Sequence, residues 1–131
     1  MPFLVIFLLS AFWLPGGANA ADKGKFSDWH ICRATIAGLM GRDPSIISID
    51  KVFGREIYLS YIRANDKKKW SYKCKIDGNK VLWGTAKGNW RLRREHSKLT
   101  FRVAGEIIII TEKFSDGSFG RYTFRLADFS K

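Results

Sequence analysis

Few side chains in this sequence are suited to nucleophilic, redox or metal chemistry. The two cysteines, Cys32 and Cys74, lie far apart and do not form a C-x-x-C redox motif, and neither histidine stands at ligand spacing from them. In an oxidising compartment, an even cysteine count instead predicts one Cys32–Cys74 disulfide. It would close a loop of about 43 residues, worth roughly 4 kcal/mol. We expect neither a metal ion nor a cofactor.

Two sequence clusters combine groups that acid–base catalysis uses. Ser27, Asp28 and His30 are neighbours, but they precede an apolar helical pattern, so capping that helix is their expected role. Glu95 and His96 fall in a polar turn, which would not enclose a substrate. We therefore expect a non-enzymatic protein. A small hydrolase that uses Glu95 and His96 remains the third functional hypothesis.

The first twenty residues have the pattern of a secretory signal peptide. The apolar run from Phe3 to Leu14 would make a helix about 18 Å long, too short for a bilayer core that needs roughly 20 residues. Pro15-Gly16-Gly17 ends the run, and Ala18-Asn19-Ala20 matches the small-x-small cleavage pattern. We expect cleavage after Ala20, a secreted or periplasmic protein that is not transmembrane, and one mature domain at residues 21–131.

A helix is predicted from about residue 28 to residue 40. Ser27 is a suitable N-cap, and Gly41 is placed to end the helix. Trp29, Cys32 and Ile36 recur at helical spacing and form one apolar stripe. The buried face of this helix would therefore carry the crosslink.

Beyond Asp43-Pro44 the apolar period changes to two, which is typical of strands. Turn residues separate the segments, and one of these turns, Asp77-Gly78-Asn79, lacks the further ligands of a calcium loop. The expected strands are Ile46–Val52, Glu56–Arg63, Trp70–Ile76, Lys80–Trp83, Trp90–Arg93, Leu99–Val103, Glu106–Glu112 and Arg121–Leu126. Short connections favour an antiparallel meander, and the disulfide would curl it over the helix. The predicted class is α+β: one N-terminal helix packed on a curled antiparallel meander sheet of six to eight strands, with one disulfide.

Nearly all of the net charge of +11 comes from one block, Lys67–Arg102, with twelve basic and two acidic residues. Because Cys74 must face the helix, the period of two places Lys73 and Lys75 on the opposite side of the sheet. The same alternation turns Trp90 and Leu92 toward the helix. If the strands are neighbours, one basic outer surface comprises Lys73, Lys75, Lys80, Arg91, Arg93 and Arg102. Residues from the turns would ring this surface: Lys67, Lys68, Lys69, Lys87, Arg94 and Lys98.

This basic surface favours binding to an anionic partner. Outside the cytosol the candidates are a polyanion (a lipid headgroup, a lipopolysaccharide phosphate or an anionic glycan) or an acidic protein. Sequence-specific nucleic-acid binding is not expected, because the aromatic residues of the basic strands are predicted to face the helix rather than to lie among the lysines. The alternative interpretation is a solvated polar face with no partner.

The run Ile107-Ile108-Ile109-Ile110 breaks the alternation of apolar and polar residues. A continuously apolar strand is covered on both faces, or its outer face meets a partner. A homodimer formed through Ile107–Ile110 is therefore the alternative functional hypothesis, in which the protein has a structural or assembly role. Cover by a loop of the same chain is the simpler explanation.

Overall fold

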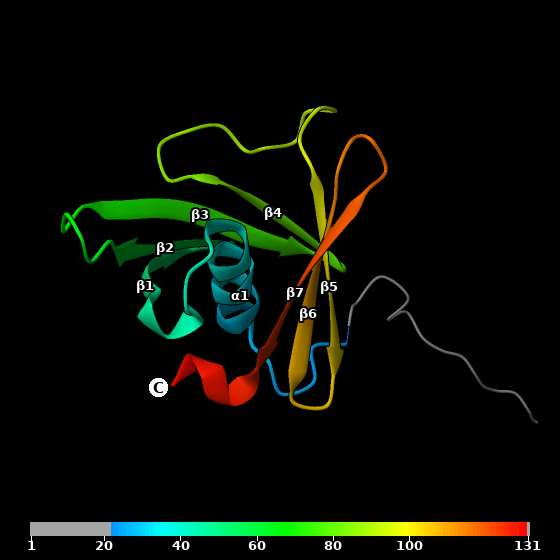
Figure 1. Cartoon of the computed structure of the whole chain (residues 1–131), viewed down its shortest axis with the longest axis horizontal. Helices are drawn as coiled ribbons and strands as arrows, with labels where there is room; N and C mark the ends of the chain where they lie inside the picture. Colours follow the sequence, from blue (N-terminus) through cyan, green and yellow to red (C-terminus); the bar gives the residue numbers. More distant parts are fainter. Residues whose placement is uncertain (1–21, 131) are drawn as a thin grey trace, which may run out of the picture.

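The computed structural model describes residues 22–130, which form one helix, a seven-stranded sheet and two short 3-10 turns (Figure 1). The expected signal segment, residues 1–20, lies outside the described residues. The strands are β1 (Ser48–Phe53), β2 (Glu56–Ile62), β3 (Lys69–Asp77), β4 (Lys80–Thr85), β5 (Lys98–Ala104), β6 (Ile107–Lys113) and β7 (Phe119–Arg125). The turns are η3 (Pro44–Ile46) and η4 (Leu126–Phe129).

Helix α1 (Asp28–Met40) has the predicted bounds and caps. The Ser27 side chain accepts a hydrogen bond from the His30 backbone N–H, and His30 Nδ1 accepts one from the Ser27 N–H. Gly41 ends the helix in the left-handed conformation, with φ of 65°. The placement of Trp29 on the buried stripe was wrong, since this side chain is 53% exposed. The sheet instead encloses the helix from Ile31 onward.

The sheet is an antiparallel meander in which the strand order follows the sequence, β1 to β7. The α+β class is therefore confirmed, and the sheet is not closed into a barrel. One predicted strand was wrong: Trp90–Arg93 belongs to an irregular connection, residues 86–97, between β4 and β5. This segment is not a strand: the Arg91 N–H donates one backbone hydrogen bond of 2.9 Å to the Trp83 carbonyl at the edge of β4, while Trp90 lies over the outer face.

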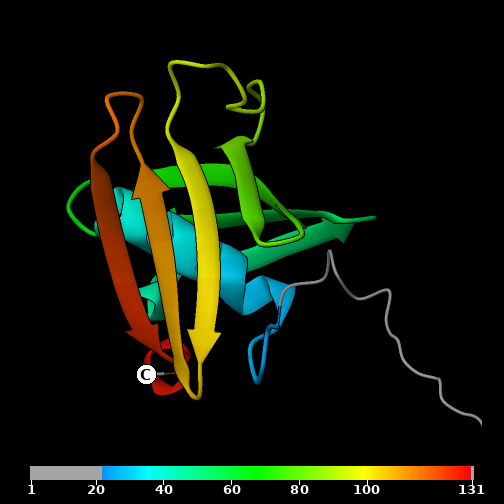
Figure 2. The ribbon, with the colours of Figure 1, turned by 90° about the vertical axis from the view of Figure 1, so that its right-hand side faces the viewer.

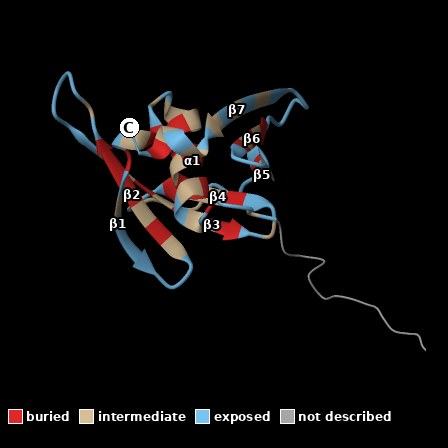
Figure 3. Ribbon diagram, turned by 90° about the horizontal axis from the view of Figure 1, so that it is seen from below, coloured by how far each residue is buried: buried red, intermediate tan, exposed pale blue. Residues whose placement is uncertain are grey.

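The sheet bends between β4 and β5. These two strands pair at only two positions, Lys80 with Thr100 and Val81 with Leu99, whereas β5 and β6 pair at seven. Strands β1–β4 and strands β5–β7 thus form two halves with α1 between them (Figures 1 and 2). The core lies against the helix: buried residues occur on α1 and on the inner faces of both halves (Figure 3).

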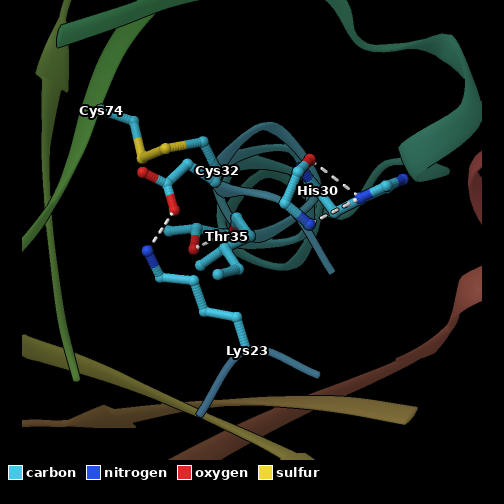
Figure 4. The surroundings of a disulfide bond; sticks show 8 residues. Lys23, His30, Cys32, Thr35 and Cys74 are labelled. Carbon is cyan, nitrogen blue, oxygen red and sulfur yellow. Dashed lines mark hydrogen bonds and ion pairs between the residues drawn. A yellow bond between two sulfur atoms is a disulfide. The ribbon is translucent and has the colours of Figure 1, made fainter. Parts of the chain in front are cut away.

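The Cys32–Cys74 disulfide is confirmed and ties α1 to β3 (Figure 4). Both cysteines are fully buried. Thr35, also fully buried on α1, donates its hydroxyl hydrogen bond to the Ile31 carbonyl at 2.8 Å, so its polar atom is satisfied within the helix. The crosslink therefore holds the helix against the β1–β4 half through the core.

Candidate functional site

Lys73 and Lys75 lie on the outer face of β3, because Tyr72, Cys74 and Ile76 are the buried residues of this strand. Neither lysine extends freely into solvent. Their ammonium groups lie 4.8 and 4.5 Å from the ring centroid of Trp90. The Lys73 ammonium also donates a hydrogen bond of 2.6 Å to the Gly88 carbonyl. Both lysines therefore help to hold the 86–97 connection on the sheet.

Trp90 was expected to face the helix, and this expectation was wrong. Its contacts with Lys73 and Lys75 place it over the outer face, where it is half-buried. Gly84 allows the connection to cross so closely, since a Cβ there would stand 2.5 Å from the Asn89 carbonyl oxygen. The absence of any side chain at Gly84, on the outward face of a basic strand, is the sequence signal for this crossing.

The other four residues of the predicted basic surface are exposed but not contiguous on one strand face. Lys80 begins β4, and Arg102 lies on the outer face of β5, beyond the bend. Arg91 and Arg93 are in the 86–97 connection, where Arg91 covers the Trp83 ring at 5.0 Å and Arg93 forms an ion pair with Glu95 at 3.0 Å. The surrounding basic residues, Lys67, Lys68, Lys69, Lys87, Arg94 and Lys98, are all exposed.

A cleft of about 330 Å³ opens where β4 and β5 diverge. Its wall is mainly apolar, and three cationic side chains line it together with two hydroxyl groups. The lining residues are Lys80, Val81, Leu82, Trp83, Arg91, Leu92, Ser97, Lys98, Leu99 and Thr100. Clefts of this volume are at the lower end of the range for small-molecule sites. This cleft could not be predicted from the sequence, because it depends on how far the two neighbouring strands β4 and β5 separate.

A buried carboxylate lies behind the cleft. Glu112, on β6, is 8% exposed and accepts hydrogen bonds from the Ser97 hydroxyl at 2.6 Å and the Tyr122 hydroxyl at 2.7 Å. The hydrogen bond to this carboxylate, with partial burial, raises the pKa of Tyr122 to about 12. The hydrogen bond between Ser97 and Glu112 holds the Ser97 hydroxyl at the cleft wall, and the hydroxyl proton is donated to Glu112.

Glu95 and His96 both contact Arg93 within the 86–97 connection. Glu95 binds the Arg93 guanidinium, and His96 Nδ1 accepts a weak hydrogen bond of 3.3 Å from the Arg93 backbone N–H. The neighbouring cleft is lined by Ser97 and Lys98 but by neither of these residues. These two contacts help to fold the connection.

The isoleucine run is split between the two faces of β6. Ile108 and Ile110 are fully buried toward the helix, whereas Ile107 is 39% exposed and Ile109 is half-buried on the outer face. Strand β6 lies between β5 and β7, so its backbone is paired on both sides. On the outer face, Ile109 is opposite Arg102 and Ile107 is opposite Arg125. The exposed isoleucines are thus flanked by cations.

Among residues 22–130 there is no group of three or more His, Cys, Asp or Glu side chains that could hold a metal ion. No helix within the described part of the chain is long and apolar enough to cross a membrane. The buried disulfide is compatible with an extracellular or periplasmic location. Comparison of the chain with protein-family models, curated proteins and solved structures gives no match.

Proposed function

We propose that this protein is a non-enzymatic binding domain of the periplasm or the extracellular space, released from its signal peptide after Ala20. Its basic outer surface, Lys73, Lys75, Lys80, Arg91, Arg93 and Arg102, binds an anionic envelope component or an acidic protein. The observation that carries the proposal is the concentration of nearly all the net charge in the block Lys67–Arg102. These cations lie on the outside of the sheet or in its connections.

The small number of ion pairs that these cations form within the described part of the chain supports the proposal. Arg93 is paired with Glu95, but within residues 22–130 Lys80, Arg91 and Arg102 form no ion pair. An unneutralised cluster of cations attracts anions over roughly one Debye length, about 8 Å at physiological salt. Lys73 and Lys75 are already engaged with Trp90, so their role is to fix the connection that presents Arg91 and Arg93.

The form of the surface favours recognition of charge over recognition of sequence. Trp90 is only half-exposed, and two lysines already lie over its ring, which disfavours base stacking. Phosphate and sulfate groups need only cations and hydrogen-bond donors. A polyanion of the cell envelope fits this chemistry better than a specific nucleic-acid sequence does.

Two variants of equal net charge test the proposal. The first replaces Lys73, Lys75, Arg91 and Arg93 with Gln. The second replaces Lys51, Lys113, Arg121 and Arg125, four exposed cations outside the block, with Gln. Binding to a sulfated glycan and to vesicles containing anionic lipid is measured for both variants and for the unaltered protein.

The proposal predicts that the first variant loses binding while the second retains most of it. Equal losses would mean that only the net charge matters, and unchanged binding by the first variant would remove its residues from the site. Loss of Lys73 and Lys75 also loosens the connection, so circular dichroism and thermal melting of both variants must show an intact fold.

A further inference from the structure

The cleft between β4 and β5 combines an apolar wall with a cationic rim. Its wall includes four aliphatic side chains and one aromatic ring: Val81, Leu82, Leu92, Leu99 and Trp83. Leu99 and Val81 are nearly fully buried at the base of the split, and Leu92 is 55% exposed on the connection above. A surface of this kind gains free energy when an apolar group displaces water from it.

The charged residues that line the cleft are all of one sign. They are Lys80, Arg91 and Lys98, and no carboxylate shares the lining. The hydroxyls of Ser97 and Thr100 complete the polar part. The Ser97 hydroxyl donates to Glu112, so it offers its lone pairs and not its proton to a ligand. The three cations favour an occupant with a negative head on an apolar body, held away from the Ser97 lone pairs.

The surroundings of the Trp83 ring favour an acyl chain over an aromatic group as the apolar part of the ligand. The Arg91 guanidinium carbon already lies 5.0 Å from the Trp83 ring centroid, and the Tyr72 ring packs at 6.1 Å from it in a tilted arrangement. A flat aromatic ligand would have to displace Arg91 to stack there. A flexible acyl chain needs no exposed ring face and can follow the aliphatic side chains.

We propose that this cleft binds a fatty acid, with the acyl chain along Leu82 and Leu92, above the nearly buried Val81 and Leu99 at the base, and the carboxylate among Lys80, Arg91 and Lys98. The site shares Lys80 and Arg91 with the basic outer surface, but it goes beyond the proposed function, because it does not require that a polyanion binds there. The free acid and not a bilayer is the expected source, since a cleft of about 330 Å³ takes a single chain.

The test uses hexanoate, octanoate and decanoate with the purified protein, below their micellar concentrations. Isothermal titration calorimetry is run in about 0.5 M salt, where the Debye length is roughly 4 Å and nonspecific attraction of the carboxylate to the surface cations is screened. The dissociation constant should fall about fourfold for each added methylene that is buried, and then stop falling once the chain fills the cleft. Octanol, which lacks the charge, should bind about tenfold more weakly than octanoate at about 0.1 M salt.

Single substitutions locate the site. Leu92→Gln should raise the dissociation constant of octanoate about tenfold, because it removes an apolar wall from an exposed loop and leaves the fold intact. Lys98→Gln should raise it about threefold. Lys51→Gln, a matched loss of charge on β1, should change nothing. Backbone amide shifts in NMR should change at Trp83, Leu92 and Lys98 on titration.

Three results would overturn the proposal: no saturable binding, equal affinity for the acid and the alcohol, or an unchanged affinity in Leu92→Gln. The two proposals fail separately. Loss of fatty-acid binding in Leu92→Gln with retained binding to the sulfated glycan would support the cleft as a distinct site. Fatty-acid binding with no binding to any polyanion would leave the cleft proposal standing and refute the proposed function.

Discussion

Removal of the Cys32–Cys74 disulfide should destabilise the domain strongly. The bond joins residues 42 apart in the sequence and connects α1 to β3. In the chain-entropy model, a crosslink of this span lowers the conformational entropy of the unfolded chain, which raises the free energy of unfolding by about 4 kcal/mol. Small domains are stable by only about 5–15 kcal/mol in total, so the loss is a large share of the free energy of unfolding.

The melting temperature should fall by roughly 15 °C on reduction, since a domain of this size loses about 4 °C for each kcal/mol. The double variant Cys32→Ala/Cys74→Ala should fall slightly further. Both sulfurs lie in the core, so truncation also leaves a small cavity there. Serine is a poorer replacement, because it would bury two hydroxyl groups.

Thermal and urea unfolding of the oxidised protein, the reduced protein and the double alanine variant would measure these differences. A second readout is the rate of reduction by a small thiol. Because both cysteines are 0% exposed, reduction of the disulfide should need local or global unfolding of the domain. The rate of reduction should therefore rise sharply at urea concentrations below the unfolding transition. Equal melting of the oxidised and reduced forms would refute the reasoning, as would fast reduction that is independent of urea.

Three further predictions follow from particular contacts. Gly84→Ala should cost about 1–3 kcal/mol in urea unfolding, because its Cβ would meet the Asn89 carbonyl oxygen at 2.5 Å; an unchanged midpoint would mean that the connection does not rest on β4. The pKa of Tyr122 is raised from 10.0 to about 12 in the folded protein, so its contribution to stability is complete below pH 10 and is lost between pH 10 and 12. Tyr122→Phe should therefore lose less stability over that interval than the unaltered protein does, and an identical loss would contradict the bond to Glu112. Association through the isoleucine strand β6 is tested by sedimentation of the unaltered protein and of Ile109→Lys at high concentration, because the Ile109 side chain lies half-buried on the outer face. A dimer should dissociate in the variant, and a strictly monomeric unaltered protein would end that hypothesis.

Much of the fold could be predicted from sequence because its signals are local. The Ser27 cap, the Gly41 stop and the helical spacing between them placed α1 correctly. The period of two found all seven strands, and the short turns predicted their order. The disulfide could be predicted because the N-terminal segment indicates an oxidising compartment and only two cysteines are present to pair there.

The connection at residues 86–97 could not be predicted from local pattern. Trp90 and Leu92 alternate with Arg91 and Arg93, which imitates a strand with one apolar face. The outcome was decided by contacts distant in sequence: Lys73 and Lys75 hold Trp90 on the outer face, and Gly84 leaves room for the backbone. Tertiary contacts outweighed the local preference for extended structure.

The location of the candidate site was only partly predictable for the same reason. Alternation on β3 placed Lys73 and Lys75 on the outside but could not show that Trp90 would cover them. The cleft arises from the divergence of β4 and β5 after two paired positions, a consequence of the bend of the sheet around α1. Leu92 and Ser97 become cleft residues only through that bend.

The central claim, that the basic outer surface is a binding site, is tested most directly by measuring binding to several polyanions across a salt series. Immobilised sulfated glycan, lipopolysaccharide and vesicles with anionic lipid would be compared between about 0.05 and 0.5 M salt. The account predicts that one anion binds well above the others at physiological salt. Weak, interchangeable binding to all of them, lost by about 0.15 M salt, would show ordinary surface charge and contradict the claim.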